Sequence, residues 1–166
     1  IKSEREIALI RRASQLAGLG VMEAMRSTRA GVYEYQLDAA ARYVFLVNGA
    51  RLDGYRSITA SGRENINRPH YFRNNRQLQD GDLVLMDYAP DYRYYVSDIG
   101  RMWPVSGRFT QAQRELLEPV LRYRDFLIEG IRPGVMTDQI LEEAAAAMED
   151  RFAEHPFRNA RYEQAA

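Results

Sequence analysis

The chain of 166 residues contains no cysteine, which excludes disulfides, thiolate metal sites and a cysteine nucleophile. Only two histidines are present, His70 and His155, so a histidine-rich metal site cannot be built from this chain alone. Acidic and basic residues number 23 each, and a net charge of zero gives no bulk attraction to nucleic acid or to an anionic membrane. No apolar run approaches the length of a membrane span. The sequence therefore predicts a soluble globular protein with no nucleic-acid partner and no membrane partner.

The first six residues are mostly charged and lead directly into a predicted helix, without the features of a signal peptide. We therefore expect a cytoplasmic protein. The chain does not begin with methionine, and we expect its numbering to start inside a longer gene product or after a removed tag. The sequence is compatible with a homodimer and does not select it.

Hydrophobic spacing and capping residues predict four helices. The first begins behind a capping box formed by Ser3 and Glu6, and a second box of the same kind begins at Thr110. Gly49 is a good stop signal for the second helix. The helices are expected at residues 4–27, 33–48 and 110–129, and from Thr137 onward.

The middle of the chain has the character of a sheet. Short apolar segments there predict strands, and polar residues rich in asparagine predict a loop between the first strand and the second. Pro90–Asp91 suits a hairpin turn. The strands are expected at residues 57–61, at 83–88, and at 94–99 with a continuation toward Val105.

A nine-residue pattern occurs twice, at an offset of 103 residues. Residues 29–37 match residues 132–140 without gaps, and the arginine, glycine, valine and glutamine coincide. A chance likeness of two helix–break–helix turns is one explanation, and a duplicated helix–helix–sheet unit is the other. In a duplication, the first unit has its strands, and the chain ends before the strands of the second.

Two aspartates, Asp87 and Asp98, lie on neighbouring predicted strands among apolar residues. Eleven positions separate them, and in a hairpin with an even-numbered loop such positions point to the same face of the sheet. Two ionised carboxylates about 5 Å apart repel by roughly 3 kcal/mol at an effective dielectric constant near 20. A shared proton, an arginine partner or a cation would remove this cost.

A divalent metal ion fits the two aspartates best. Arg101 is a poor partner, because strand parity puts it on the opposite face from Asp98. One bidentate and one bridging carboxylate is a common way to hold two metal ions. The alternative is that both aspartates are surface residues at strand ends. His70, a lone loop histidine, is by itself more typical of a surface residue than of a ligand.

Several segments, in their order and spacing, are similar to the Xaa-Pro aminopeptidase and prolidase branch of the pita-bread (M24) metallopeptidases. The likeness extends over nearly the whole chain, from Glu4 to Val135. The segments that carry it are residues 57–62, 70–71, 75–87 and 95–101.

This resemblance implies an α+β pita-bread fold. Residues 1–166 would be the N-terminal portion of a single peptidase domain: the first of two pseudo-symmetric helix–helix–sheet units, plus the helices of the second. Asp87 and Asp98 would bind two divalent metal ions, manganese, cobalt or zinc. His70 would be the catalytic histidine of the substrate site, and Tyr71 would bind substrate beside it.

The implied activity is that of an aminopeptidase which hydrolyses N-terminal peptide bonds, at Xaa-Pro, by a hydroxide that two metal ions activate. A prolidase-type dipeptidase and a non-catalytic binding module are the alternatives. The family takes one histidine and two glutamates from its second half, and no segment here matches them; His155 lacks their setting. Residues 1–166 alone are therefore expected to be inactive. The binding-module alternative has some support in a basic loop that contains Arg63, Arg68, Arg73 and Arg76.

Overall fold

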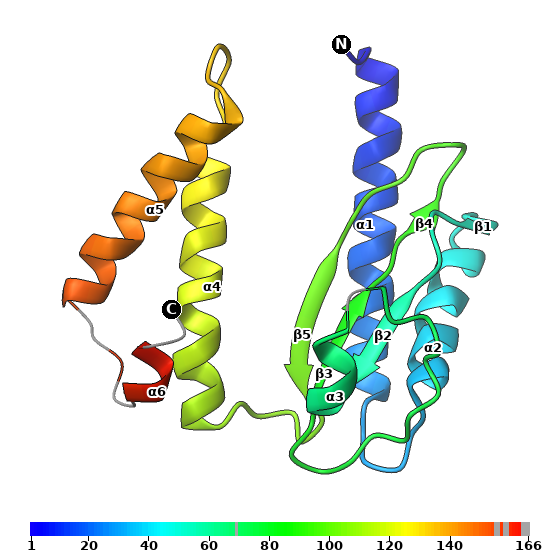
Figure 1. Cartoon of the computed structure of the whole chain (residues 1–166). Coiled ribbons are helices and arrows are strands. Elements are labelled where there is room, and N and C mark those ends of the chain that lie inside the picture. Colours follow the sequence, from blue (N-terminus) through cyan, green and yellow to red (C-terminus); the bar gives the residue numbers. More distant parts are fainter. Residues whose placement is uncertain (69, 155–156, 158–159, 164–166) are drawn as a thin grey trace. The chain divides into compact units, whose positions relative to one another are not determined.

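The computed structural model describes residues 1–68, 70–154, 157 and 160–163. It divides the chain into two compact units, unit 1 (residues 1–108) and unit 2 (residues 109–166). Figure 1 labels their elements. Unit 1 contains α1 (Glu4–Ser27), α2 (Glu34–Val47), β1 (Leu52–Asp53), β2 (Ile58–Ser61), α3 (Gly62–Ile66), β3 (Leu83–Asp87), β4 (Pro90–Asp91) and β5 (Gly100–Pro104). Unit 2 contains α4 (Gln111–Gly130), α5 (Thr137–Glu154) and α6 (Ala160–Glu163).

Helices α1 and α2 pack against each other in unit 1. The predicted capping box opens α1: the Ser3 hydroxyl accepts from the Glu6 amide, and the Glu6 carboxylate accepts from the Ser3 amide at 2.7 Å. Gly20 allows a close helix approach, because a Cβ there would lie 2.3 Å from the ring of Phe45. Gly49 follows α2 with a positive φ of 87°, as the sequence predicted for its end. The first two predicted helices are confirmed, the second to within one residue at each end.

The sheet of unit 1 has three antiparallel strands in the order β2-β3-β5. Side chains alternate along β3, so Val84 and Met86 are buried in the core that α1 and α2 share with the sheet. Leu85 and Asp87 point to the other face, where they are half-buried. Figure 1 shows both helices behind the sheet. Asp87 therefore lies at the end of a central strand, on the face away from the helices.

The strand predicted from residue 94 toward Val105 is confirmed only in its second part, β5, and is wrong at residues 94–99; the turn predicted at Pro90–Asp91 is also wrong. Those two residues form β4, which pairs with β1, and the hairpin turns instead at Arg93 and Tyr94, both with positive φ. The backbone amide of Tyr94 donates to the Asp91 carboxylate at 2.8 Å, which stabilises this turn. The chain then has no regular structure until β5 begins.

The polar stretch between β2 and β3 is not entirely loop. It opens with the short helix α3, which the sequence did not predict. Gly62 begins that helix with a φ of 70°, and a Cβ there would lie 2.5 Å from the guanidinium of Arg76. The guanidinium of Arg76 forms an ion pair with Asp82, so this part of the predicted basic loop is neutralised.

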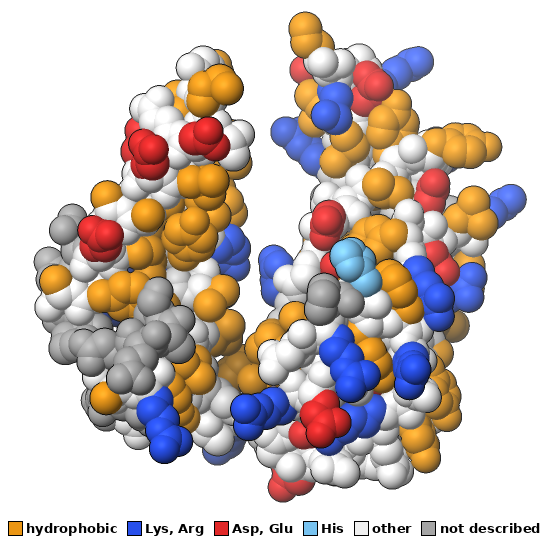
Figure 2. Space-filling model, viewed as in Figure 1, with side chains coloured by type: hydrophobic (Ala, Val, Ile, Leu, Met, Phe, Trp, Pro, Cys, Tyr) orange, Lys and Arg blue, Asp and Glu red, His pale blue; other side chains and the backbone are white. Residues whose placement is uncertain are grey.

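Unit 2 repeats the helix–break–helix of unit 1. The hydroxyl of Thr110 caps α4 as predicted. Helix α4 ends at Gly130 and α5 begins at Thr137, which are the positions of Ser27 and Glu34 shifted by 103 residues. Figure 2 shows hydrophobic side chains reaching the surface of α4 and α5 at many places. Among the described residues, no helix is long and apolar enough to span a membrane.

Candidate metal centre

Asp87 ends β3, and a tyrosine holds its carboxylate. The hydroxyl of Tyr55, in the segment before β2, donates to Asp87 Oδ1 at 2.6 Å. Burial raises the pKa of Tyr55 well above its ordinary value, and the bond to Asp87 raises this pKa further. The phenol therefore stays protonated at neutral pH and acts as a permanent donor to the carboxylate. One oxygen of Asp87 thus accepts from Tyr55, on the face of the sheet away from the helices.

Asp98 is exposed and lies two residues before Gly100, the residue that pairs with Asp87 in the ladder. Asp98 therefore lies in the irregular segment before β5 and not on a strand as the sequence predicted. The negative charges of Asp87 and Asp98 both contribute to the raised pKa of Tyr55. Asp87 thus bonds to this hydroxyl directly, and the charge of Asp98 acts on it through space.

The two carboxylates suit a divalent cation in part. Oxygen donors favour hard and intermediate metals such as manganese, which commonly take five or six ligands. Within the described residues, however, no group of three histidine, cysteine, aspartate or glutamate side chains comes together in a way that could hold a metal ion. Asp87 and Asp98 are thus a partial ligand set that needs further donors.

The loop between α3 and β3 carries His70. Its side chain is exposed, its φ is 55°, and its ring centroid lies 6.0 Å from that of Phe72. The guanidinium carbon of Arg56 lies 5.1 Å from the centroid of the Phe72 ring, and the same guanidinium donates to the Phe72 carbonyl at 2.8 Å. No hydrogen bond or ion pair in the described part of the chain connects His70 to either aspartate. His155, the second histidine, lies outside the described residues.

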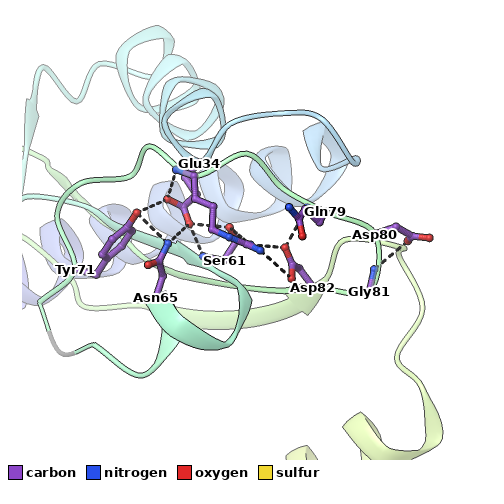
Figure 3. A network of polar contacts seen from close by, with 9 residues as sticks. Glu34, Ser61, Asn65, Tyr71, Gln79, Asp80, Gly81 and Asp82 are labelled. Atoms are coloured by element: carbon purple, nitrogen blue, oxygen red, sulfur yellow. Dashed lines mark hydrogen bonds and ion pairs between the residues drawn. The ribbon is translucent and has the colours of Figure 1, made fainter.

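Tyr71 points into the protein, to a buried carboxylate that the sequence analysis did not single out. Its hydroxyl donates to Glu34 Oε2 at 2.8 Å, and the residue is 6% exposed. Glu34, on the first turn of α2, is fully buried and also accepts from Ser61 and Asn65 (Figure 3). The predicted contact of Tyr71 with substrate stays a prediction, and the hydroxyl that would make it is already bonded to Glu34.

Asp38 lies one helical turn after Glu34 and is a half-buried carboxylate of α2. It accepts hydrogen bonds from the hydroxyls of Ser57 and Thr59, at the start of β2, and from the amide of Asn74 at 2.6 Å. Burial raises the pKa of Asp38, and these donors oppose that rise. Glu34 and Asp38 thus connect α2 to the strand and to the His70 loop.

Sequence reasoning missed Tyr55, Glu34 and Asp38. A signal for Glu34 exists, because it shares a helix face with the buried Leu37 and Ala41, and an acid on an apolar face needs partners. No comparable signal marks Tyr55, which lies in an irregular segment whose path only the fold determines.

Residues 8–162 match metallopeptidase family M24, so the chain belongs to this family. Its relatives include the Xaa-Pro aminopeptidase of Escherichia coli (strain K12), 39% identical over 147 residues that are 89% of this chain and 33% of that protein. The Xaa-Pro aminopeptidase of Haemophilus influenzae is 41% identical over 143 residues, 86% of this chain and 33% of its own length. The chain thus spans about a third of the length of these relatives.

Solved structures agree with the sequence comparison. Zn-substituted E. coli aminopeptidase P in complex with product matches with a TM-score of 0.85 and 37% identity, over 92% of this chain and 34% of that one. Alanine variants of the same enzyme also match: two replace aspartates eleven positions apart, and one replaces a histidine seventeen positions before the first aspartate. The α+β pita-bread fold predicted from the sequence is confirmed.

The family name implies a divalent metal cofactor, as the sequence analysis expected. The roles of Asp87, Asp98, His70 and Tyr71 stay predictions, as does the assignment of residues 1–166 to one domain.

Proposed function

We propose that this chain supplies part of the catalytic domain of a metal-dependent aminopeptidase that cleaves the N-terminal residue from peptides with proline in second position. One observation carries the proposal: the Asp87 carboxylate at the end of β3 accepts from the Tyr55 hydroxyl at 2.6 Å, and the charge of Asp98, just before β5, acts on the same hydroxyl. The relatives named Xaa-Pro aminopeptidase give the proposed substrate. Manganese, cobalt and zinc are the proposed metals, two ions per site.

Spacing along the chain supports the proposed residues. Asp98 follows Asp87 by eleven positions, and His70 precedes Asp87 by seventeen. The aspartates and the histidine replaced in the E. coli variants have the same two spacings. The other E. coli variants concern three histidines and a glutamate at least 79 positions after the second aspartate. Counted from Asp98, those positions fall beyond residue 166, and donors from such a region would complete the partial ligand set.

Each residue has a distinct part in the proposed reaction. Bound divalent ions would activate water and polarise the scissile carbonyl. Asp87 and Asp98 would hold them, and Tyr55 would keep the Asp87 carboxylate in one orientation by its hydrogen bond. His70, exposed on its loop, would donate a hydrogen bond to the peptide.

The alternatives rest on weaker observations. A non-catalytic binding module would not need Asp87 and Asp98, and the basic loop that supported it includes Arg76, which pairs with Asp82. A prolidase-type dipeptidase differs from an aminopeptidase in the length of peptide it accepts, so a tripeptide substrate distinguishes the two. A homodimer and a cytoplasmic location stay predictions.

The first test replaces Asp98 by asparagine in the complete protein. We expect bound metal to fall and Xaa-Pro cleavage to drop more than about 100-fold, beyond the usual cost of losing a residue that supports a ligand. The matched control is Asp80→Asn, because Asp80 is an exposed aspartate of the same unit. Full activity and metal content in the Asp98 variant would refute the metal site.

The second test concerns specificity. The complete protein, loaded with manganese, is assayed on a tripeptide with proline second and on one with N-terminal methionine followed by alanine. We expect faster cleavage of the proline peptide. A preference for the methionine peptide would assign the protein to a different substrate class while leaving the metal site intact.

A further inference from the structure

The loop that carries His70 has a backbone conformation that must be held from outside. His70 has a φ of 55° and Asn74 a φ of 48°, both in the left-handed region. Residues other than glycine adopt this region at a cost, so two of them within five positions persist only where surrounding contacts fix them. Those contacts come mainly from one helix, α2.

Glu34 fixes the loop at two points. The Tyr71 hydroxyl and the Arg76 amide, both in the loop, donate to Glu34 Oε2 at 2.8 and 3.0 Å. On the other side, the amide and the hydroxyl of Ser61 in β2 donate to Oε1 at 2.6 and 2.7 Å. Figure 3 shows Tyr71, Asn65 and Ser61 gathered around this carboxylate. One buried side chain thereby joins helix, strand and loop.

Asp38 fixes the loop at a third point. The side-chain amide of Asn74 donates to Asp38 at 2.6 Å and to the Ser57 carbonyl at 3.2 Å. The carbonyl oxygen of the same side chain accepts from the Thr59 amide at 3.2 Å. Asn74 is buried, so these bonds face little competition from water.

His70 has no such anchor of its own. In the part of the chain that the structure describes, no hydrogen bond reaches its ring, whose aromatic neighbour is Phe72 at 6.0 Å. The place of the imidazole therefore depends on the backbone that carries it. The next residue, Tyr71, holds that backbone in place, because its hydroxyl donates a hydrogen bond to Glu34.

We propose that Glu34 and Asp38 are positioning residues, which hold the loop of residues 70–76 so that the imidazole of His70 is presented to the peptide substrate. The part that concerns substrate rests on the proposed function; the part that concerns the loop does not. A carboxylate is required at position 34 because every group around it is a donor. An amide there would turn its own NH2 toward the donors of one side, the loop or Ser61, and lose the contacts of that side.

The experiment compares two variants of the complete protein, Tyr71→Phe and Ser61→Ala. Each removes one hydroxyl that donates to Glu34, at nearly equal distances. Tyr71 belongs to the loop, whereas Ser61 belongs to β2, and its hydroxyl touches the loop only through the Arg76 side chain at 3.2 Å. Hydrogen–deuterium exchange of the peptide that spans residues 70–76 is measured first. We expect exchange about tenfold faster in Tyr71→Phe, as for loss of one hydrogen bond to a charged group, and less than twofold faster in Ser61→Ala. Equal exchange in the two variants would overturn the proposal.

Activity then tests the positioning role. We expect Tyr71→Phe to lower kcat/KM on the proline tripeptide about tenfold while bound metal is unchanged, and Glu34→Gln to lower it further. In a His70→Ala background, Tyr71→Phe should change kcat/KM less than twofold, because the histidine it positions is absent. The same fold-loss in both backgrounds would show that Tyr71 does not act through His70 and would overturn the positioning role.

The two proposals fail in different ways. If the complete, metal-loaded protein cleaves neither peptide, the proposed function is wrong, and the exchange comparison still decides whether α2 holds the loop. If the protein is active and loop exchange does not respond to Tyr71→Phe, the proposed function stands and the positioning proposal is wrong.

Discussion

The two helix pairs of this chain have the same local structure and very different surroundings. The turn between α1 and α2 contains Gly31 with a φ of 87°, and the turn between α4 and α5 contains Gly134 with a φ of 81°. In the first turn, Gly31 and Val32 exchange backbone hydrogen bonds with Leu78. In the second, the described backbone bonds are local: the amide of Val135, for example, donates to Arg132.

The two helix pairs also differ in how many of their side chains are buried. Helix α2 buries Glu34, Leu37, Ala41 and Phe45 against α1 and the sheet. Helix α4 has no buried residue, and Val120 and Ile128 on it are 61% and 59% exposed. The helix–break–helix is thus present in both units, whereas a core shared between helices and a sheet is described only in unit 1.

The largest expected effect comes from truncating aligned positions of the repeat. Leu37→Ala should lower the free energy of unfolding of unit 1 by about 2–5 kcal/mol, because the side chain is fully buried. Ile140→Ala should cost no more than about 1.5 kcal/mol, because Ile140 is only half-buried. Fluorescence of Trp103, the single tryptophan, reports unfolding of unit 1, and far-UV circular dichroism reports the helices of both units.

Leu37→Ala and Ile140→Ala should lose more similar amounts of unfolding free energy in a longer protein whose strands cover α5. If the two variants of the 166-residue chain lost equal free energy of unfolding, the sheet would not make the α1–α2 pair more stable than the α4–α5 pair, and the comparison would fail.

A smaller effect is expected where the covered pair is most tightly packed. Gly20→Ala puts a methyl group 2.3 Å from the Phe45 ring and 3.2 Å from the Ala41 carbonyl, so overpacking should destabilise unit 1 by about 1–3 kcal/mol. Gly18→Ala, two residues earlier on the same helix, meets nothing within 4 Å and should stabilise by about 0.5–1 kcal/mol. Urea unfolding followed by Trp103 fluorescence measures both, and opposite signs are the expected result.

Substitution of the glycine in each turn should cost the two repeats a similar amount of stability. Gly31→Ala and Gly134→Ala each force a Cβ into the left-handed region, at a cost of about 1–2 kcal/mol. Neither methyl group would meet a close neighbour, so the cost is purely local. Circular dichroism during urea unfolding should give similar losses for the two variants. A much larger loss at Gly31 would show that the covered turn depends on tertiary contacts.

The smallest expected effect is on the pH dependence of stability. As pH rises, the contribution of Asp38 to stability should fall and that of Glu143 should grow. Burial raises the pKa of Asp38, so its contribution to stability is greatest below the ordinary carboxyl pKa and is lost as pH rises through the raised value. A hydrogen bond from Arg132 lowers the pKa of Glu143, so its contribution is present above the ordinary pKa and is lost as pH falls through the lowered value. Urea unfolding between pH 3 and 7 should show opposite changes of slope in Asp38→Asn and Glu143→Gln.

The helices were predictable because their signals are local. Ser3 and Thr110 mark two starts, and Gly31 and Gly134 mark the breaks, each by the conformation of one or two residues. The central strand was predictable from its short apolar segment, which ends at Asp87. The hairpin was not: Arg93 and Tyr94 are poor turn residues by composition, and pairing of β4 with β1 and the bond from Tyr94 to Asp91 select them.

The sequence by itself determined the four long helices, the repeated turn, the strand that ends at Asp87 and the spacing from Asp87 to Asp98, because each depends on neighbours a few positions apart. Only the tertiary structure decided which groups hold these residues in place. Tyr55 reaches Asp87 across 32 positions, and Tyr71 reaches Glu34 across 37. Contacts at such separations follow from the packing of helix against sheet, which no local pattern encodes.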